Sequence, residues 1–200
     1  MIDIVCLDLE GVLVPEIWIN VAERCGIEEL RRTTRDEPDY DKLMRSRIAI
    51  LDEHKLSLAD IQAVIAQMGP LEGAKAFLDE LRSLTQVLIL SDTFAEFAKP
   101  LMQQLGWPML WCNSLFVEDG RIVSHRMRIN NGKKEAIEAL RALNFRSFAA
   151  GDSYNDLAMI EAADDGCLFR APKAILNDYP HLAITEEYGQ LMARIKEFLS

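Results

Sequence analysis

The chain lacks the residues that define several common kinds of protein. It has 4 cysteines, and these form no CxxC pair and have no neighbouring histidine: Cys6, Cys25, Cys112 and Cys167. This scatter excludes a disulfide framework and a thiolate metal site. No stretch reaches the roughly 18 apolar residues needed to span a bilayer, and no basic region precedes the first short apolar run, so we expect no signal peptide. A cytoplasmic protein with reduced thiols is predicted.

Positive charge is also scarce, with 22 Lys and Arg against 32 Asp and Glu and a net charge of −10. Such a balance argues against nucleic acid or an anionic membrane as partner. An anionic small-molecule substrate would need a local cluster of Lys, Arg, metal ion or backbone N–H groups. The sequence does not decide between a monomer and a homodimer.

Apolar β-favouring runs alternate with helical periodicity, which predicts βαβ units and an α/β fold. The predicted strands are 3–8, 86–91, 147–150, 166–169 and a weaker one at 109–112. The predicted helices are 74–84, 94–105, 133–143, 155–163 and 187–199. Residues 115–124 predict a hairpin that turns at Asp119-Gly120. We expect a three-layer Rossmann-like parallel sheet.

One segment interrupts the alternation. From Pro15 to Pro70 only helical patterns occur, and Ser57 can cap a helix over 58–67. The segment is longer than a single crossover helix requires, so it predicts a helical cap inserted after the first strand. The predicted domains are therefore a base formed by 1–14 and 71–200 and a cap formed by 15–70. The cap would overhang the carboxyl ends of the strands.

Three of the predicted strands end in polar residues. They are followed by Asp8-x-Glu10-Gly11, by Ser91-Asp92-Thr93 and by Gly151-Asp152-Ser153-Tyr154-Asn155-Asp156. The carboxyl ends of parallel strands converge, and open α/β sheets bind their ligands there. Taken singly, each segment is equally typical of a solvated strand end. Together they predict a cluster of carboxylates around one hydroxyl.

The residue types in this cluster indicate its chemistry. Carboxylate oxygens without His or Cys suit Mg²⁺. A Ser hydroxyl, helix N-termini and a lysine from Asn131-Gly132-Lys133-Lys134 suit a phosphate. A metal, a phosphate and a free carboxylate together are what phosphoryl transfer through an aspartyl-phosphate requires.

The order and spacing of these segments resemble the haloacid dehalogenase-type phosphohydrolases over residues 3–170. The resemblance implies that Asp8 is the nucleophile and that Mg²⁺ is held by Asp8, Asp152 and the main-chain carbonyl of Glu10. It implies that Asp156 orients either the metal's water or Lys133. It also implies the substrate-binding positions, which are Ser91, Asp92, Thr93, Lys133 and Asn155. Lys134 is the alternative to Lys133, which we prefer because the helix is predicted to begin there.

The cap resembles that of the phosphoserine phosphatases. In those enzymes an early cap Glu binds the substrate amino group and a cap Arg binds its carboxylate. Glu16 and Arg47 are the matching positions, with Arg45 as the alternative to Arg47. One anion and one bidentate cation placed away from the phosphate suit a zwitterionic substrate. The competing interpretation is that both residues lie on a solvated helix face.

Glu10 departs from the family pattern, which usually has Asp two residues after the nucleophile. In the family this carboxyl donates a proton to the leaving group and then activates water. One extra methylene moves it by more than about 1 Å, and such shifts can cost about 10²-fold in rate. The chain also resembles a bacterial branch with this Glu, described as bifunctional phosphoserine phosphatase and phosphoserine:homoserine phosphotransferase. The alternative is that Glu simply replaces Asp.

Other functions share part of the pattern. A phosphatase for another small phosphate ester would use the same motifs. A receiver-type signalling module also places an Asp at a strand end, but the cap and the distant Asp152 disfavour it. A catalytically inactive binding protein would lack a nucleophile or metal acid, and none is missing. The histidines, His54, His125 and His181, lie outside the motifs and are expected at the surface or in loops.

Overall fold

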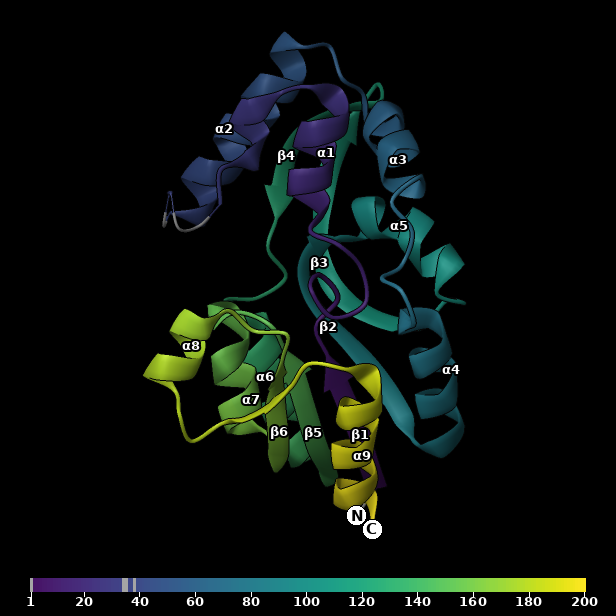
Figure 1. Cartoon of the computed structure of the whole chain (residues 1–200). Coiled ribbons are helices and arrows are strands. Elements are labelled where there is room, and N and C mark those ends of the chain that lie inside the picture. The colour runs from purple at the N-terminus through teal and green to yellow at the C-terminus, as the bar shows by residue number, and fades with distance from the viewer. Residues whose placement is uncertain (1, 34–35, 38) are drawn as a thin grey trace.

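The structure is a computed structural model that describes residues 2–33, 36–37 and 39–200. Its centre is a sheet of strand order β4-β3-β2-β1-β5-β6-β7, parallel throughout except for the β3–β4 pair (Figure 1). The strands are β1 Ile2–Leu7, β2 Gln86–Phe94, β3 Met109–Glu118, β4 Arg121–Arg126, β5 Phe145–Gly151, β6 Asp165–Phe169 and β7 Ala183–Thr185. The predicted α/β class is confirmed.

Helices cover both faces of the sheet because β1 is apolar on both sides. Val5 and Leu7 belong to a core cluster that includes residues of α4 (Ala74–Leu84), α5 (Ala95–Gln104) and α9 (Tyr188–Leu199). Ile4 and Cys6 point the other way, into a cluster with residues of α6 (Gly132–Ala142), α7 (Leu157–Ala162) and α8 (Lys173–Asp178). Successive side chains of a strand face opposite sides, so one short run supplies both interfaces of the three-layer domain.

The helices between β1 and α4 form the predicted helical insertion, which stands over the sheet in Figure 1. It contains α1 Ile17–Cys25, a 3-10 turn at Glu28–Arg31, α2 Tyr40–Glu53 and α3 Leu58–Ala66. Helix α3 begins where the sequence predicts, because Ser57 and Asp60 form a reciprocal capping box.

The predicted hairpin is confirmed and extends further than expected. Strand β3 continues to Glu118, the chain turns at Asp119-Gly120 with positive φ at both residues, and β4 returns antiparallel. Strand β4 lies against α2, and the N–H of Leu58 donates to the carbonyl of Gly120 over 2.8 Å. The hairpin therefore packs on the helical insertion although it falls within the predicted base. The boundaries at 14/15 and 70/71 stay predictions.

Two short elements were not predicted from the sequence. Strand β7 has 3 residues at the sheet edge, and α8 has 6 residues. The helix expected at 155–163 begins as a 3-10 turn over Tyr154–Asp156 before α7. Within the described part of the chain, no helix combines the length and apolarity that crossing a membrane requires.

Candidate active site

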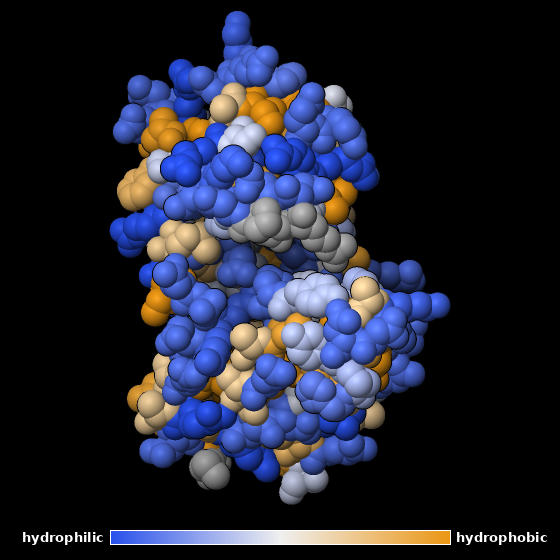
Figure 2. Space-filling model, turned by 90° about the vertical axis from the view of Figure 1, so that its left-hand side faces the viewer, coloured by the Kyte–Doolittle hydropathy of each residue, from blue (hydrophilic) through white to orange (hydrophobic). Residues whose placement is uncertain are grey.

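The carboxyl ends of β1, β2 and β5 meet at the floor of a cleft beneath the helical insertion. Its volume is about 630 Å³. The base contributes Asp8, Ser91, Asp92, Thr93, Lys133 and Asn155 to its lining, and the segment that leaves β1 contributes Glu10, Glu16 and Arg47. Figure 2 shows the surface hollowed between the part that carries α2 and the part that carries α8, with mainly hydrophilic residues around the hollow.

Lys133 connects the acids at the floor. Its Nζ lies 2.6 Å from Asp156 Oδ1, 2.9 Å from Asp8 Oδ1 and 3.8 Å from Asp92 Oδ2. Burial alone would lower the pKa of Lys133, but Asp156, Asp8 and Asp92 together hold it well above its usual value. The ammonium therefore stays charged. Lys134, the alternative, pairs instead with Glu138 one turn further along α6.

Asp156 shapes the loop after β5. Its side chain is fully buried, and Oδ2 accepts hydrogen bonds of 3.1 Å from the backbone N–H groups of Asp152 and Ser153. Gly151 permits this close approach, since a Cβ there would meet the Asp156 side chain at 2.3 Å. The loop thus turns the Asp152 side chain toward β1.

Three carboxylates could hold a cation. One oxygen each of Asp8, Asp152 and Asp156 lie within 4.8 Å of one another. Burial and then Asp156 raise the pKa of Asp8 well above its usual value, against the effect of Lys133. Burial and Asp156 also raise the pKa of Asp152 to about 7. A second cation beside Lys133 would relieve this repulsion, so the donor set fits Mg²⁺.

Gly11 brings the β1 loop against Asp152. It has φ of +76°, and a Cβ there would lie 2.3 Å from Asp152 Oδ2. Its N–H donates to the carbonyl of Val14, which closes the turn over 2.8 Å. This turn at Gly11 therefore also sets how near Asp8 and Asp152 come.

The carboxyl end of β2 presents its polar groups to the same floor. Ser91 and Thr93 are each 6% exposed, and the N–H of Thr93 donates to Ser91 Oγ over 3.2 Å. Asn155 Nδ2 donates to Asp92 Oδ2 over 2.9 Å, which joins the carboxyl end of β2 to the loop after β5. The structure thus brings these predicted residues together.

Two residues near the site were missed by the sequence reading. Asn113 on β3 donates to the carbonyl of Asp92 over 3.0 Å, and the Tyr40 hydroxyl approaches the same carbonyl at 3.5 Å. A signal existed for both. Asn113 interrupts an apolar strand, and Tyr40 lies two helical turns before Arg47, on the same face of α2.

Glu10 lines the cleft and also contacts the start of α1. Its Oε2 accepts a 2.8 Å hydrogen bond from the N–H of Ile17, the first residue of α1. Burial and the Glu16 carboxyl raise the pKa of Glu10 to about 8, although the Ile17 N–H lowers it. Glu10 therefore carries a proton at neutral pH.

Arg47 lies above the cleft and is only 6% exposed. Its Nη2 donates to the carbonyl of Arg32 over 2.7 Å, and its guanidinium stacks on the Trp18 ring at 4.4 Å. Burial lowers its pKa to about 10, so it remains a cation near pH 7. Its Nε is buried without a hydrogen-bond partner among the described residues. Arg45, the alternative, lies outside the lining of this cleft.

Residues 2–164 match the family model of the haloacid dehalogenase-like hydrolases. The chain belongs to this hydrolase family. The family resemblance seen in the sequence motifs is thereby confirmed.

Two relatives of this haloacid dehalogenase-like chain are similar over nearly all of its length. A phosphoserine phosphatase of Pseudomonas syringae pv. tomato is 53% identical over 199 residues, which cover 99% of this chain and 83% of the relative. Phosphoserine phosphatase ThrH of Pseudomonas aeruginosa is 52% identical over 198 residues, which cover 98% of this chain and 95% of the relative.

Solved structures support the fold. A phospho-aspartyl intermediate analogue of phosphoserine phosphatase superimposes with a TM-score of 0.78 at 19% identity, covering 96% of this chain and 98% of that one. A substrate-bound phosphoserine phosphatase gives 0.77 at 20% identity and covers 98% of both chains. At these identities the likeness concerns the three-layer architecture of the family alone.

Proposed function

We propose that the chain is a Mg²⁺-dependent phosphoserine phosphatase that acts through an aspartyl-phosphate on Asp8. The main observation behind this proposal is that groups suited to a phosphate and groups suited to an amino acid line the same cleft. Asp8, Ser91 and Lys133 lie at its floor, and Glu16 and Arg47 lie on its other side. The names of the two Pseudomonas relatives support the same substrate.

In the first step, a carboxylate oxygen of Asp8 attacks the phosphorus of phosphoserine. The new bond joins Asp8 to phosphorus, and the bond between phosphorus and the serine oxygen breaks. The proton held on Glu10 passes to that serine oxygen, which leaves as a hydroxyl. The raised pKa of Glu10, about 8, keeps this proton available at neutral pH.

The phosphate charge is balanced by fixed donors. Lys133 Nζ, 2.9 Å from Asp8 Oδ1, and the Ser91 hydroxyl hold the non-bridging oxygens. Asp8, Asp152 and the main-chain carbonyl of Glu10 would hold Mg²⁺, with Asp156 positioning Lys133 and the loop of Asp152. When bound, the cation supplies charge neutralisation between the carboxylate and the phosphate.

The amino-acid part of the substrate is recognised by the insertion. Glu16 binds the ammonium, and Arg47 binds the carboxylate with its charge-assisted donors. Asp92, Thr93 and Asn155 border the phosphate end of the cleft and contact the substrate there. Exclusion of bulk water under the insertion strengthens each of these contacts.

In the second step, an acceptor hydroxyl takes the phosphoryl group from Asp8. Its oxygen bonds to phosphorus, the acyl-phosphate bond breaks, and its proton goes to the carboxylate form of Glu10. Water yields inorganic phosphate. Because Glu10 is longer than the usual Asp and is hydrogen-bonded to Ile17, we also propose that the side-chain hydroxyl of homoserine serves as acceptor.

Product analysis tests this function. Phosphoserine and Mg²⁺ are incubated with and without homoserine, and the phosphorus-containing products are resolved by ³¹P NMR. Serine and inorganic phosphate are expected, joined by O-phosphohomoserine when homoserine is present. Faster turnover of sugar or carboxylate phosphates than of phosphoserine would instead favour a phosphatase for another small phosphate ester.

A cytoplasmic location, a small-molecule partner and the absence of nucleic-acid or membrane binding remain predictions.

A further inference from the structure

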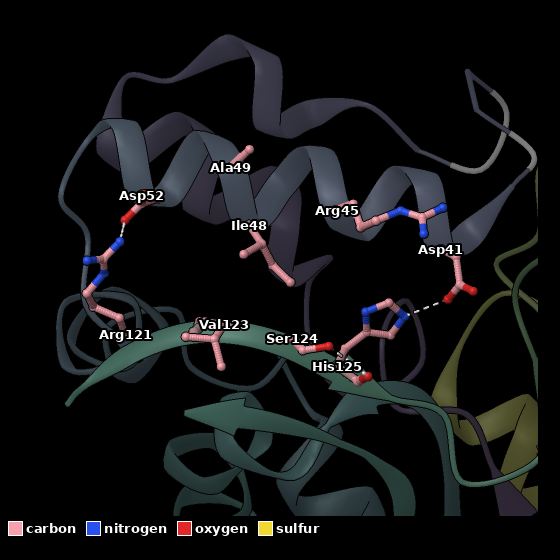
Figure 3. Close-up of a pocket in the computed structure, with 10 residues that line it drawn as sticks. Asp41, Arg45, Ile48, Ala49, Asp52, Arg121, Val123, Ser124 and His125 are labelled. Atoms are coloured by element: carbon pink, nitrogen blue, oxygen red, sulfur yellow. Dashed lines mark hydrogen bonds and ion pairs between the residues drawn. The ribbon is translucent and has the colours of Figure 1, made fainter. Parts of the chain in front are cut away.

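A second cavity, of about 570 Å³, lies between α2 and β4. Figure 3 shows α2 on one side and the β3–β4 hairpin on the other. Helix α2 separates this cavity from the catalytic cleft. Leu43 and Arg47 line the cleft, whereas Arg45 and Ile48 line the second cavity.

Ion pairs close both ends of this cavity. At one end His125 Nε2 lies 2.9 Å from Asp41 Oδ1, and at the other end Arg121 pairs with Asp52 (Figure 3). The His125 side chain is only 8% exposed and meets the Tyr40 ring edge-on. His125 is thus a strand residue held in place, and the expectation of a surface or loop position is wrong for it.

Arg45 lies between the two ion pairs along α2 (Figure 3). No described residue forms a hydrogen bond or ion pair with it. The two acids of the cavity, Asp41 and Asp52, are each paired with a base of β4. Arg45 is therefore the arginine of this cavity that pairs with no described acid.

The rest of the lining is suited to an aliphatic group. Ile48 projects from α2 toward the hairpin (Figure 3), and Ile122 and Val123 of β4 are among the residues that line the cavity. Ser124 adds one hydroxyl to the lining. One cation next to an apolar surface favours a ligand with a single negative charge and an apolar end.

We propose that this cavity binds a small aliphatic carboxylate, with the carboxylate on Arg45 and the chain between Ile48 and strand β4. Such a ligand contacts α2 and β4 together and fixes their separation. It occupies the side of α2 opposite the catalytic cleft, so it binds without displacing inorganic phosphate from the cleft. The site is independent of the proposed function.

The probe is 4-methylpentanoate, titrated into the full chain by isothermal calorimetry and by ¹H–¹⁵N NMR. Saturable binding in the millimolar range is expected for a ligand of this size. Arg45→Gln should weaken it about tenfold or more, because a charge-assisted bidentate contact is lost. Arg126→Gln, an exposed cation of β4 outside the cavity, is the matched control and should bind as the parent does.

Two further binding experiments identify where the carboxylate of the ligand lies. 4-Methylpentylamine keeps the apolar chain and reverses the charge, so it should not bind. Arg47→Gln removes the guanidinium of the catalytic cleft and should leave the affinity unchanged. The proposal is overturned if no saturable binding occurs, if the amine binds equally well, if Arg45→Gln binds like the parent, or if Arg47→Gln abolishes binding. The last result would place the carboxylate in the catalytic cleft.

Discussion

The carboxylate of Glu10 accepts a 2.8 Å hydrogen bond from the backbone N–H of Ile17. Ile17 is the first residue of α1, so its N–H is one of those that a helix cannot pair internally. The acid proposed to transfer the proton is therefore oriented by the helix that opens the insertion. Proton transfer and the position of the insertion are linked through this bond.

Asp8→Asn should abolish turnover while the protein stays folded, since the amide keeps the size but loses the nucleophile. Asp3→Asn, at the other end of the same strand, is the control. It breaks a half-exposed pair with Arg146 and should cost no more than about 1 kcal/mol without loss of activity. Steady-state activity and thermal unfolding are measured for both. Retained turnover in Asp8→Asn would contradict the covalent mechanism.

Arg47→Ala should damage phosphoserine use far more than hydrolysis of p-nitrophenyl phosphate. Losing a charge-assisted contact should cost about 1.5–3 kcal/mol, or roughly 10- to 150-fold in kcat/KM. Arg126→Ala serves as the cationic control. Equal losses on both substrates would mean that Arg47 acts structurally, and a selective loss in Arg45→Ala instead would reverse the assignment between the two arginines.

Gly11→Ala should lower activity by about 10²-fold or more, because its Cβ would push Asp152 away from Asp8. Gly26→Ala is a matched control, with φ of +67° and nothing within 4 Å of the added carbon. Both variants carry backbone strain of about 1–3 kcal/mol, visible as a lower Tm. Only Gly11→Ala should also weaken the response to Mg²⁺, and equal activities of the two variants would refute the spacing role.

Mg²⁺ should raise Tm more at pH 8 than at pH 6. The pKa of Asp152 is about 7 in the folded protein and about 3.9 when unfolded. The folded state thus holds this proton more tightly, and stability falls as pH rises from about 4 through 7. Above that range the ionised carboxylates of Asp8, Asp152 and Asp156 repel one another, and bound Mg²⁺ would reduce this repulsion.

Differential scanning fluorimetry with Mg²⁺, or with Na⁺ at matched ionic strength, checks this pH dependence. Asp152→Asn should shrink the difference between the two pH values, because the titrating carboxyl is gone. A Mg²⁺ effect that is equal at pH 6 and pH 8 in the parent protein would contradict it.

Glu10→Asp should shift the products toward inorganic phosphate at a fixed homoserine concentration. Both acceptors compete for one aspartyl-phosphate on Asp8, so only their relative barriers count, and 1.4 kcal/mol is a tenfold change. The shorter acid regains the position usual in the family. The ratio of O-phosphohomoserine to phosphate is measured for both proteins. An unchanged ratio would show that Glu10 is a neutral replacement.

The sequence predicted the parts of the fold that local patterns determine. Buried strands such as β1 and the capped helix α3 are specified by apolar runs and by Ser57 with Asp60. The length of β3 was underestimated because its second half alternates and extends beyond the base sheet. The His125–Asp41 pair joins residues 84 positions apart, and no local pattern reports such a contact.

Strand β3 pairs with β2 in the base and, after Asn113, with β4 beneath α2. An insertion connected to its base only by loops can move by rotation about a few backbone bonds. Here the β3–β4 hairpin, which packs on the insertion, continues strand β3 of the base sheet. Separating the insertion from the base would therefore bend β3 near Asn113, where the β2–β3 register shifts. In the proposed reaction, product release that requires the insertion to separate from the base would therefore depend on how easily β3 bends near Asn113.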